Sequence, residues 1–241
     1  MRFSVRSPDD EIILRTARDG QRGWYLASCD GWEGTPAPRE KAESAAGRDG
    51  DLWPSMLTQG ARTLTLSGFA RCESAVEGAR AAARVNALFG QALEVVGEGA
   101  DGRRRVRGFL ADDPRVRLAK RGAIVAFDLV ISCPDPHRYG DPLTFRASGG
   151  ACKVANEGNI GAWPVVEAAG PLTYLTLSLG GQRVSWSGSA QALVLDFADM
   201  EPSAGTVTYD DAFQVPPGRS DVAVSCNSGA SVALTVAPAW R

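Results

Sequence analysis

The order of apolar and polar residues predicts short β-strands along most of the chain. In residues 63–67 the two kinds of side chain alternate, which places Leu64 and Leu66 together on one face of a strand. Alternation or short β-branched runs also predict strands at residues 2–6, 11–16, 22–29, 93–96, 103–110, 116–118 and 124–132. The first half of the chain is therefore expected to be rich in β-structure.

One amphipathic helix interrupts these strands. Ser74 and Glu77 have the spacing of a capping box, and Gly90 stands where a left-handed C-cap residue belongs. Between them, four apolar residues at helical spacing predict a buried face: Ala81, Val85, Leu88 and Phe89. The helix is expected to cover one side of the sheet, with Phe89 in the core.

The second half shows short strands and no helical period. The predicted strands are residues 153–155, 165–168, 172–179, 183–186, 192–197, 206–209, 221–225 and 231–237. Gly180-Gly181 and Asn227-Ser228-Gly229 predict tight hairpin turns. Many short strands within about 100 residues are typical of a two-sheet sandwich or a jelly roll.

Residues 133–142 separate two regions of different composition. Three prolines in this stretch disfavour both a helix and a central strand. Residues 142–241 contain only 5 of the 26 Lys and Arg residues and 8 of the 28 Asp and Glu residues. We therefore predict a mainly β protein with two domains: an α+β domain with one helix at residues 1–138, and an all-β sandwich at residues 139–241.

A long segment without periodicity, residues 32–60, lies within the first domain. Segments of this length inside a compact domain are mostly functional or disordered, so it is a candidate arm, although a flexible surface insertion is the simpler interpretation. It contains apolar residues that a solvated linker would lack, and charged residues stand beside them. The apolar residues are Leu52, Trp53, Met56 and Leu57, and the charged residues are Arg48, Asp49 and Asp51. We expect this set to contact an adjacent subunit.

The strongest run of charge is the arginine-rich stretch at residues 103–107. On a strand, Arg103, Arg105 and Arg107 share one face, and Arg104 and Val106 share the other. Nucleic-acid binding is one interpretation, but no aromatic residues are interleaved for base stacking. A solvated face, or contact of these three arginines with an acidic neighbouring subunit, fits the pattern better.

The sequence gives little support for catalysis or cofactor binding. His137 is the only histidine, so a histidine-based triad or metal site cannot be assembled, and a loop histidine of this kind is more often solvated or capping a turn. The paired carboxylates Asp112-Asp113 and Asp210-Asp211 are better explained by turns. Five widely spaced cysteines are expected to be free thiols. No cofactor and no metal ligands are therefore predicted.

Charge and hydropathy exclude two further classes of partner. The formal net charge of −2 produces no uniform field that would attract nucleic acid or an acidic membrane. No stretch approaches the roughly 18 apolar residues that a membrane span requires. The first residues show the alternation of a strand and not the apolar segment of a signal peptide, so we expect synthesis in a cytoplasm.

Four aromatic residues of the second half could stack on sugars if they were exposed: Trp163, Trp186, Tyr209 and Trp240. Burial in the core of the sandwich is the alternative. Galectins, which have a comparable number of strands, recognise sugar through a histidine and an arginine, and no histidine follows residue 137. Sugar binding of that type is therefore not expected.

Four motifs, taken in order, resemble the distal tail proteins of long-tailed siphoviruses. The first is Asp30-Gly-Trp-Glu-Gly followed by Arg48-Asp-Gly-Asp and Arg62-Thr-Leu-Thr-Leu-Ser-Gly, and the second is Pro134-Asp-Pro-His-Arg-Tyr-Gly. The third is Asn156-Glu-Gly, closely followed by Trp163-Pro-Val-Val and Gly170, and the last is Phe213-Gln-Val-Pro-Pro-Gly before Trp240. Each motif is weak, and the resemblance rests on their order along nearly the whole chain.

This resemblance implies a structural role in the tip of a phage tail. It implies an N-terminal belt domain that assembles into a hexameric ring around the tail axis, and an outward-facing galectin-like domain. The implied neighbours are the tail tube protein, the hub or tail-tip protein and a receptor-binding protein, and the implied location is the baseplate of the virion. Two alternatives remain open: a carbohydrate-binding or adhesion module with a β-sandwich, and a hydrolase whose site has no motif.

Overall fold

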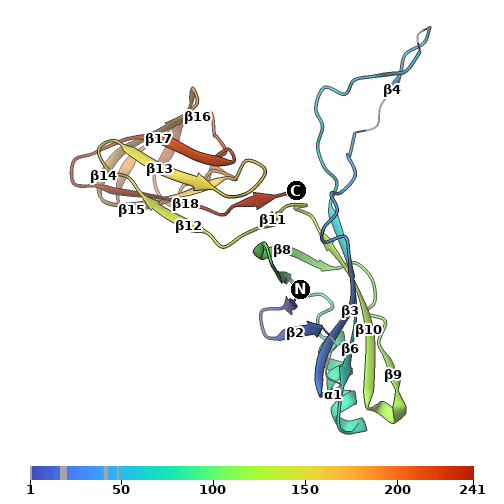
Figure 1. The fold of residues 1–241 in the computed structure, drawn as a ribbon. Coiled ribbons are helices and arrows are strands. Elements are labelled where there is room, and N and C mark those ends of the chain that lie inside the picture. Colours follow the sequence, from blue (N-terminus) through green and yellow to red (C-terminus); the bar gives the residue numbers. More distant parts are fainter. Residues whose placement is uncertain (1, 17–20, 41–42, 48) are drawn as a thin grey trace. The chain divides into compact units, whose positions relative to one another are not determined.

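The computed structural model describes residues 2–16, 21–40, 43–47 and 49–241, and the chain divides into two compact units (Figure 1). Unit 1 is Met1–Arg138 with Arg241, and unit 2 is Tyr139–Trp240. Strands dominate both units, so the prediction of a mainly β protein is confirmed. The short strands β11 (Arg138–Tyr139) and β19 (Ala239–Trp240) lie at the two ends of the stretch that forms unit 2.

Unit 1 is a closed sheet made of two antiparallel halves. Its strands are β1 (Arg2–Arg6), β2 (Glu11–Thr16), β3 (Gly23–Asp30), β6 (Arg62–Arg71), β7 (Leu93–Gly99), β8 (Gly102–Leu110), β9 (Arg117–Ala119) and β10 (Ile124–Cys133). They follow the order β8-β7-β1-β2-β3-β6-β10-β9, and β8 also pairs with β10. The two junctions, β2 with β3 and β8 with β10, are each only two residue pairs long. Unit 1 therefore resembles a barrel that is flattened into two layers.

The core of unit 1 lies between these two layers. Inward-facing residues alternate with outward-facing ones along each strand, as the pattern at residues 63–67 predicted, and Leu64 and Leu66 are fully buried. Val5 of β1 and Val95 of β7 meet them from the opposite layer, and Phe127 of the neighbouring strand β10 adds to the same core. Strands β6 and β10 bury one face only, so the register of this pair is set by its apolar side chains.

Helix α1 (Ala75–Asn86) is shorter than the pattern predicted. Ser74 caps its start by accepting a hydrogen bond from the Glu77 amide at 3.2 Å, as expected from the capping box. The helix ends at Asn86, four residues before Gly90, and the chain turns there through bonds of the 3₁₀ type. Leu88 turns into the core, but Phe89 turns outward and is 60% exposed, so its predicted burial is wrong.

Unit 2 contains two long strands where the pattern predicted four short ones. Its strands are β12 (Leu143–Arg146), β13 (Ala151–Asn156), β14 (Pro164–Leu179), β15 (Gln182–Asp196), β16 (Thr206–Asp210), β17 (Gly218–Cys226) and β18 (Ser231–Val236). The sequence pattern predicted separate strands at residues 165–168 and 172–179, and at residues 183–186 and 192–197. Gly170 instead adopts a φ of +105° next to an irregularity of register, so β14 continues with a bend.

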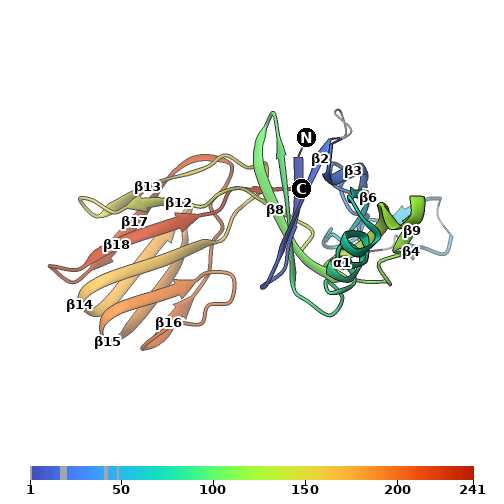
Figure 2. The ribbon, with the colours of Figure 1, turned by 90° about the horizontal axis from the view of Figure 1, so that it is seen from below.

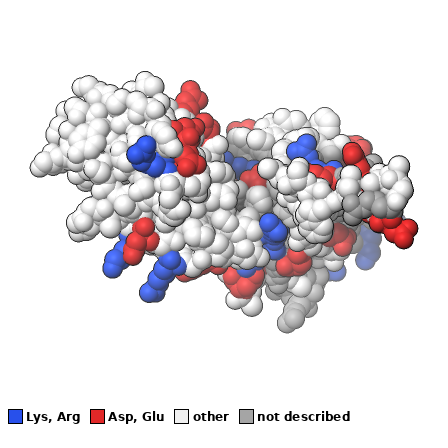
Figure 3. Space-filling model, turned by 90° about the horizontal axis from the view of Figure 1, so that it is seen from above, with Lys and Arg blue, Asp and Glu red and all other residues white. Residues whose placement is uncertain are grey.

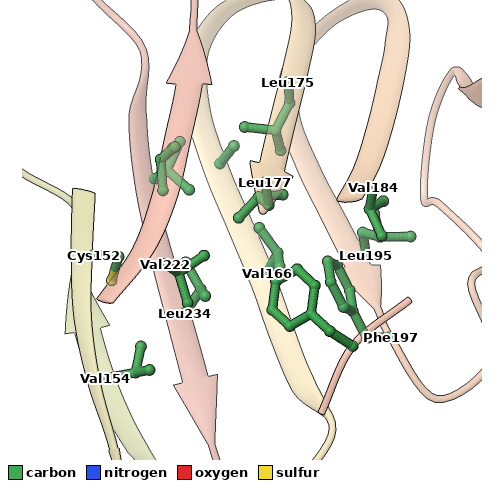
Figure 4. Close-up of a cluster of buried hydrophobic side chains, with 14 of the residues drawn as sticks. Cys152, Val154, Val166, Leu175, Leu177, Val184, Leu195, Phe197, Val222 and Leu234 are labelled. Atoms are coloured by element: carbon green, nitrogen blue, oxygen red, sulfur yellow. The ribbon is translucent and has the colours of Figure 1, made fainter. Parts of the chain in front are cut away.

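The two long strands belong to both layers of unit 2 (Figure 2). The first half of β14 pairs with β18, and its second half pairs with β17. The layers enclose one apolar core, in which Val166 and Leu234 of one layer lie near Leu177 and Val222 of the other (Figure 4). A single hairpin of β14 and β15 therefore organises the whole sandwich.

The two glycine-containing turns of unit 2 differ from each other. Gly180 and Gly181 have φ values of +60° and +94° and join the directly paired residues Leu179 and Gln182, so this hairpin turn is confirmed. The predicted hairpin at Asn227 is wrong, because β17 and β18 do not pair with each other. The Asn227 carboxamide oxygen instead accepts hydrogen bonds from the backbone amides of Thr173 and Tyr174 at the irregular part of β14.

One buried asparagine holds the loops at one end of unit 2 together. Asn156 donates to the carbonyl oxygens of Ile160 at 2.7 Å and Val215 at 2.9 Å, and its own oxygen accepts from the Gly158 amide. Gly158 lies so close to Ala239 that a Cβ would meet the Ala239 carbonyl oxygen at 2.0 Å. The position of Gly158 therefore has no room for a side chain, and the position of Asn156 requires a side chain that can both donate and accept hydrogen bonds.

We expect Asn156→Ala to lower the free energy of unfolding of unit 2 by about 2–3 kcal/mol, because it leaves buried polar groups without partners. Asn227→Ala is the matched control, since Asn227 also binds backbone amides but lies where water can replace it. Urea unfolding followed by tryptophan fluorescence measures both. Equal losses for the two variants would contradict the role given to Asn156.

Candidate functional site

The candidate site is an arm, residues 35–60, that leaves unit 1 after β3 and returns to it at β6 (Figure 1). Its two sides pair with each other. Strand β4 (Glu43–Ser44) pairs with β5 (Asp51–Leu52), and nearer the body of unit 1 the Gly60 amide donates to the Ala37 carbonyl at 3.0 Å. The expected lack of internal structure is therefore wrong. Backbone pairing of this kind needs no alternation of apolar side chains, so the sequence pattern did not reveal it.

A side-chain contact strengthens the middle of the arm. The Glu40 carboxylate accepts hydrogen bonds from the Thr58 hydroxyl and from the Thr58 amide, and the Arg39 amide donates to the Thr58 carbonyl at 3.0 Å. The bond from the hydroxyl, and then the bond from the amide, lower the pKa of Glu40. The charged carboxylate therefore holds the two sides of the arm together.

Trp32 belongs to the core of unit 1 and not to the arm. Its side chain is 2% exposed, and its ring meets Phe3 edge to face with a centroid distance of 5.0 Å. Gly97 makes room for this ring, since a Cβ there would lie 2.5 Å from Cζ2 of Trp32. The preceding Gly31 has a φ of +84° and lies against the Thr63 carbonyl. The arm root, which we define as residues 31–34, is therefore packed into the body of the unit.

A buried arginine fastens the arm root. Nη1 of Arg62 donates to the carbonyl oxygens of Gly31 at 2.6 Å and Gly34 at 2.6 Å, and to that of Trp32 at 3.2 Å. Nε of the same side chain donates to the Pro136 carbonyl at 2.7 Å. Burial lowers the pKa of Arg62, and the nearby charge of Arg138 lowers it further, but an arginine stays charged in a protein. One guanidinium therefore links the arm root to the end of unit 1.

A second arginine supports the same place. Arg138 is nearly buried, and its guanidinium carbon lies 5.9 Å from the centre of the Trp32 ring. Nη1 lies 3.1 Å from the Glu33 carboxylate, and Nη2 donates to the Arg241 carbonyl at 2.8 Å. Glu33 belongs to the arm root. Arg62 therefore binds the backbone of the root, and Arg138 binds its one carboxylate.

The returning side of the arm, from β5 to the residue before Thr58, exposes the apolar residues that the sequence analysis singled out. Exposed fractions run from 45% for Leu52 to 85% for Trp53, with Met56 and Leu57 between them. We call these four residues the tip. Asp49 and Asp51 are exposed beside the tip, and the predicted Arg48 lies outside the described residues. A fastened root with an uncovered apolar tip is an arrangement suited to contact with another molecule.

The arginines of β8 form a separate surface. Val106 is buried in the core and Arg104 is mostly covered, so the predicted division of this strand into two faces is confirmed. Arg103 and Arg107 are exposed on the outer face, and Arg105 lies between them with Nε at 3.7 Å from Glu94. Strand β8 pairs with β7, β10 and β11, whereas β4 and β5 of the arm pair with each other. The structure thus does not combine the two predicted sets of residues into one site.

The other candidate residues serve the fold. Asp112 accepts from the Asp113 amide and Asp210 from the Ala212 amide, so both carboxylate pairs belong to turns, as expected. Asp135 accepts a hydrogen bond from the His137 amide at 3.0 Å. Of the aromatic residues, Trp186 is buried and donates to the Ala204 carbonyl. Trp163 and Tyr209 are exposed, so burial in the core is wrong for these two. All five cysteines are free thiols.

The described residues contain neither a metal site nor a membrane-spanning helix. No group of three or more His, Cys, Asp or Glu residues in the described ranges could hold a metal ion. Within the same ranges, no helix has the length and hydropathy needed to cross a membrane. Figure 3 shows that the face of unit 2 visible there carries few charged side chains, in keeping with its composition. The arm therefore remains the strongest candidate.

We expect Arg62→Met to lower the free energy of unfolding of unit 1 by about 2–4 kcal/mol, because it leaves buried carbonyl groups unpaired. Arg62→Lys is the control and should lose less stability, since a lysine keeps the charge but cannot bind the arm root and the Pro136 carbonyl at the same time. Urea unfolding measures stability, and limited proteolysis measures opening near residues 31–34. Unchanged stability and cleavage in Arg62→Met would contradict the fastening role.

A second prediction concerns two thiols near the arm root. Burial raises the pKa of Cys29 to about 12 and that of Cys133 to about 11, from 9.0 for an ordinary thiol. Above pH 9 the unfolded chain loses these protons while the folded chain keeps them, so stability falls as pH rises from 9 towards 11. Unfolding in urea between pH 8 and 10.5 tests this. In the double variant Cys29→Ala with Cys133→Ala, the free energy of unfolding should fall less steeply with pH. An identical slope would contradict the raised pKa values of these two thiols.

Three solved structures share the fold of the whole chain. The Dit (gp 19.1) protein of SPP1, described as a paradigm of the hub adsorption apparatus in phages that infect Gram-positive bacteria, has a TM-score of 0.69 and 12% identity, with 99% of each chain covered. Chains of the phage P2 baseplate in its activated conformation have TM-scores of 0.56 with Ca, at 8% identity, and 0.53 with Sr, at 9% identity. Both cover 98% of each chain.

The likeness to these proteins is one of fold and not of close sequence. No protein-family model matches the sequence, and no curated protein is similar to it. The resemblance that four weak motifs indicated is nevertheless confirmed in the fold, over nearly the full length of both chains. Along its whole length, this chain has the fold of phage tail hub and baseplate proteins.

Proposed function

We propose that this chain is a distal tail protein, a structural component of the phage baseplate that forms a ring at the tip of the tail. The single observation that carries the proposal is the shared fold over 99% of this chain and 99% of the SPP1 protein. In this proposal the ring is hexameric and joins the tail tube protein to the hub and the host-recognition apparatus. The chain would be made in the host cytoplasm and end in the virion, with no catalytic role.

The two units would divide this work. Unit 1, with its closed sheet, helix and arm, would be the belt domain that forms the ring, because it carries the exposed apolar tip. Unit 2 would be the galectin-like domain that faces outward and receives the receptor-binding protein. Its independent core and its few charges suit a rigid support.

The arm supports the proposal of a ring on energetic grounds. Burying a large apolar side chain contributes roughly 1.5–3 kcal/mol, and the tip has four of them. Ordering a free segment would offset much of that gain, since fixing each residue costs about 1–2 kcal/mol. Here the root is packed and the two sides of the arm are paired before any contact forms. The arm is thus preorganised, and more of the apolar gain remains for association.

We expect the purified chain to assemble into a ring that depends on the arm. Replacing residues 40–57 by Asn-Gly joins Arg39 to Thr58, which already face each other, through a two-residue turn. This variant, and separately Trp53→Ala with Leu57→Ala, should lose the ring in native mass spectrometry and keep the circular dichroism of the monomer.

The matched control is Val76→Ala with Leu118→Ala. These side chains are 62% and 57% exposed elsewhere on unit 1, so they should be dispensable for the ring. A wild-type chain that stays monomeric, alone and with its tail tube protein, would overturn the proposed ring. If the shortened variant assembles as well as the wild type, the role given to the arm is wrong, and the proposed ring itself is not affected.

A further inference from the structure

Unit 1 has an exposed apolar groove on its body, apart from the arm. The groove has a volume of about 660 Å³, and its walls include Phe89 and Phe109, which are 60% and 48% exposed. Phe89 turns outward because α1 ends early, and Phe109 turns outward because it precedes the buried Leu110 on β8. Neither phenylalanine belongs to a hydrophobic core of the chain. Two exposed aromatic rings in one hollow are unusual for a surface without a partner.

The groove is preformed by rigid elements. Phe109 lies on β8 opposite Ser132 of β10, at one of the two places where the sheet of unit 1 closes. Gly108 permits this close approach, since a Cβ there would meet the Ser132 carbonyl oxygen at 2.4 Å. Gly90, with a φ of +77°, fixes the turn behind Phe89. An occupant would therefore not have to order this surface.

Two charged residues line the groove, Arg107 and Asp135. Arg107 lines it and shares the outer face of β8 with Arg103 and Arg105. Glu94, the residue opposite Arg107 on β7, already lies 3.7 Å from both Arg6 and Arg105. Among the described residues, Arg107 has no ion pair. An occupant with an acidic group next to apolar ones would complement the Arg107 side of the groove.

We propose that the groove of one copy receives the tip of the arm from the adjacent copy in the ring, an inference that rests on the proposed function. Trp53 and Leu57 of the tip pack between Phe89 and Phe109, and the acidic residues beside the tip, Asp49 and Asp51, face Arg107. Contact between aromatic rings contributes more free energy than the burial of their apolar area alone. Apolar side chains meet apolar side chains in this contact, and the acidic residues meet Arg107.

This pairing also gives the geometry that a ring needs. Each copy has one tip and one groove, which are different surfaces, so the contact is heterologous. Every copy then donates one arm and accepts one, and the series ends only when the last groove is filled by the first arm. The contact between tip and groove therefore arranges the copies head to tail around the ring.

The test mixes two variants of the full chain. A tip variant, Trp53→Ala with Leu57→Ala, keeps its groove, and a groove variant, Phe89→Ser with Phe109→Ser, keeps its tip. Each alone should be monomeric in native mass spectrometry, and an equimolar mixture should give a 1:1 heterodimer that does not grow. Val76→Ser with Leu118→Ser, which removes equally exposed apolar side chains, should still form rings. Circular dichroism verifies that every variant is folded.

A charge exchange tests the same contact independently. Asp51→Arg and Arg107→Asp should each weaken the ring at least tenfold in the concentration for half-assembly, and both changes in one chain should restore it. Groove variants that assemble like the wild type, or a mixture that stays monomeric, would overturn the groove while leaving the proposed ring intact. A wild-type chain that never associates would overturn both.

Discussion

The buried guanidinium of Arg62 is the interaction on which the arrangement of unit 1 depends. A charge can remain inside a protein only where polar groups surround it, and here backbone carbonyls of the arm root and of Pro136 do so. These carbonyls come from irregular segments that have no sheet partners to satisfy them. The arginine and the irregular backbone therefore stabilise each other, and the arm can leave the body of the unit from a fixed position. Trp32 adds apolar packing at the same point.

The sequence predicted the strands and the helix start well, because local rules govern both. Alternation places Leu64 and Leu66 inward, and the Ser74 cap stands where the capping box put it. The end of the helix could not be predicted equally well, since Leu88 and Phe89 are both apolar and only tertiary packing decides which of them is buried. The continuity of β14 was missed for a related reason: Gly170 permits a bend as readily as a break.

The candidate site was predicted in part. The exposed apolar tip followed from residues 52–57, because apolar side chains in an aperiodic segment are unusual. Arg62 and Arg138 were not predicted as structural residues, since arginines are rarely buried and their carbonyl partners lie 28–103 positions away in the sequence. The motifs that carried the resemblance include Asn156 and Gly158, which hold loops together in unit 2.

The hairpin of β14 and β15 has a consequence for how unit 2 folds. Its two strands are neighbours in sequence and meet at a two-residue turn, so they can pair early, before contacts between distant segments form. Because each strand runs through both layers, one pairing event sets the register of both. A slip by a single residue would turn the apolar side chains of both layers outward at once. Misfolded forms with one correct layer and one wrong layer are thereby disfavoured, and folding of unit 2 should be cooperative.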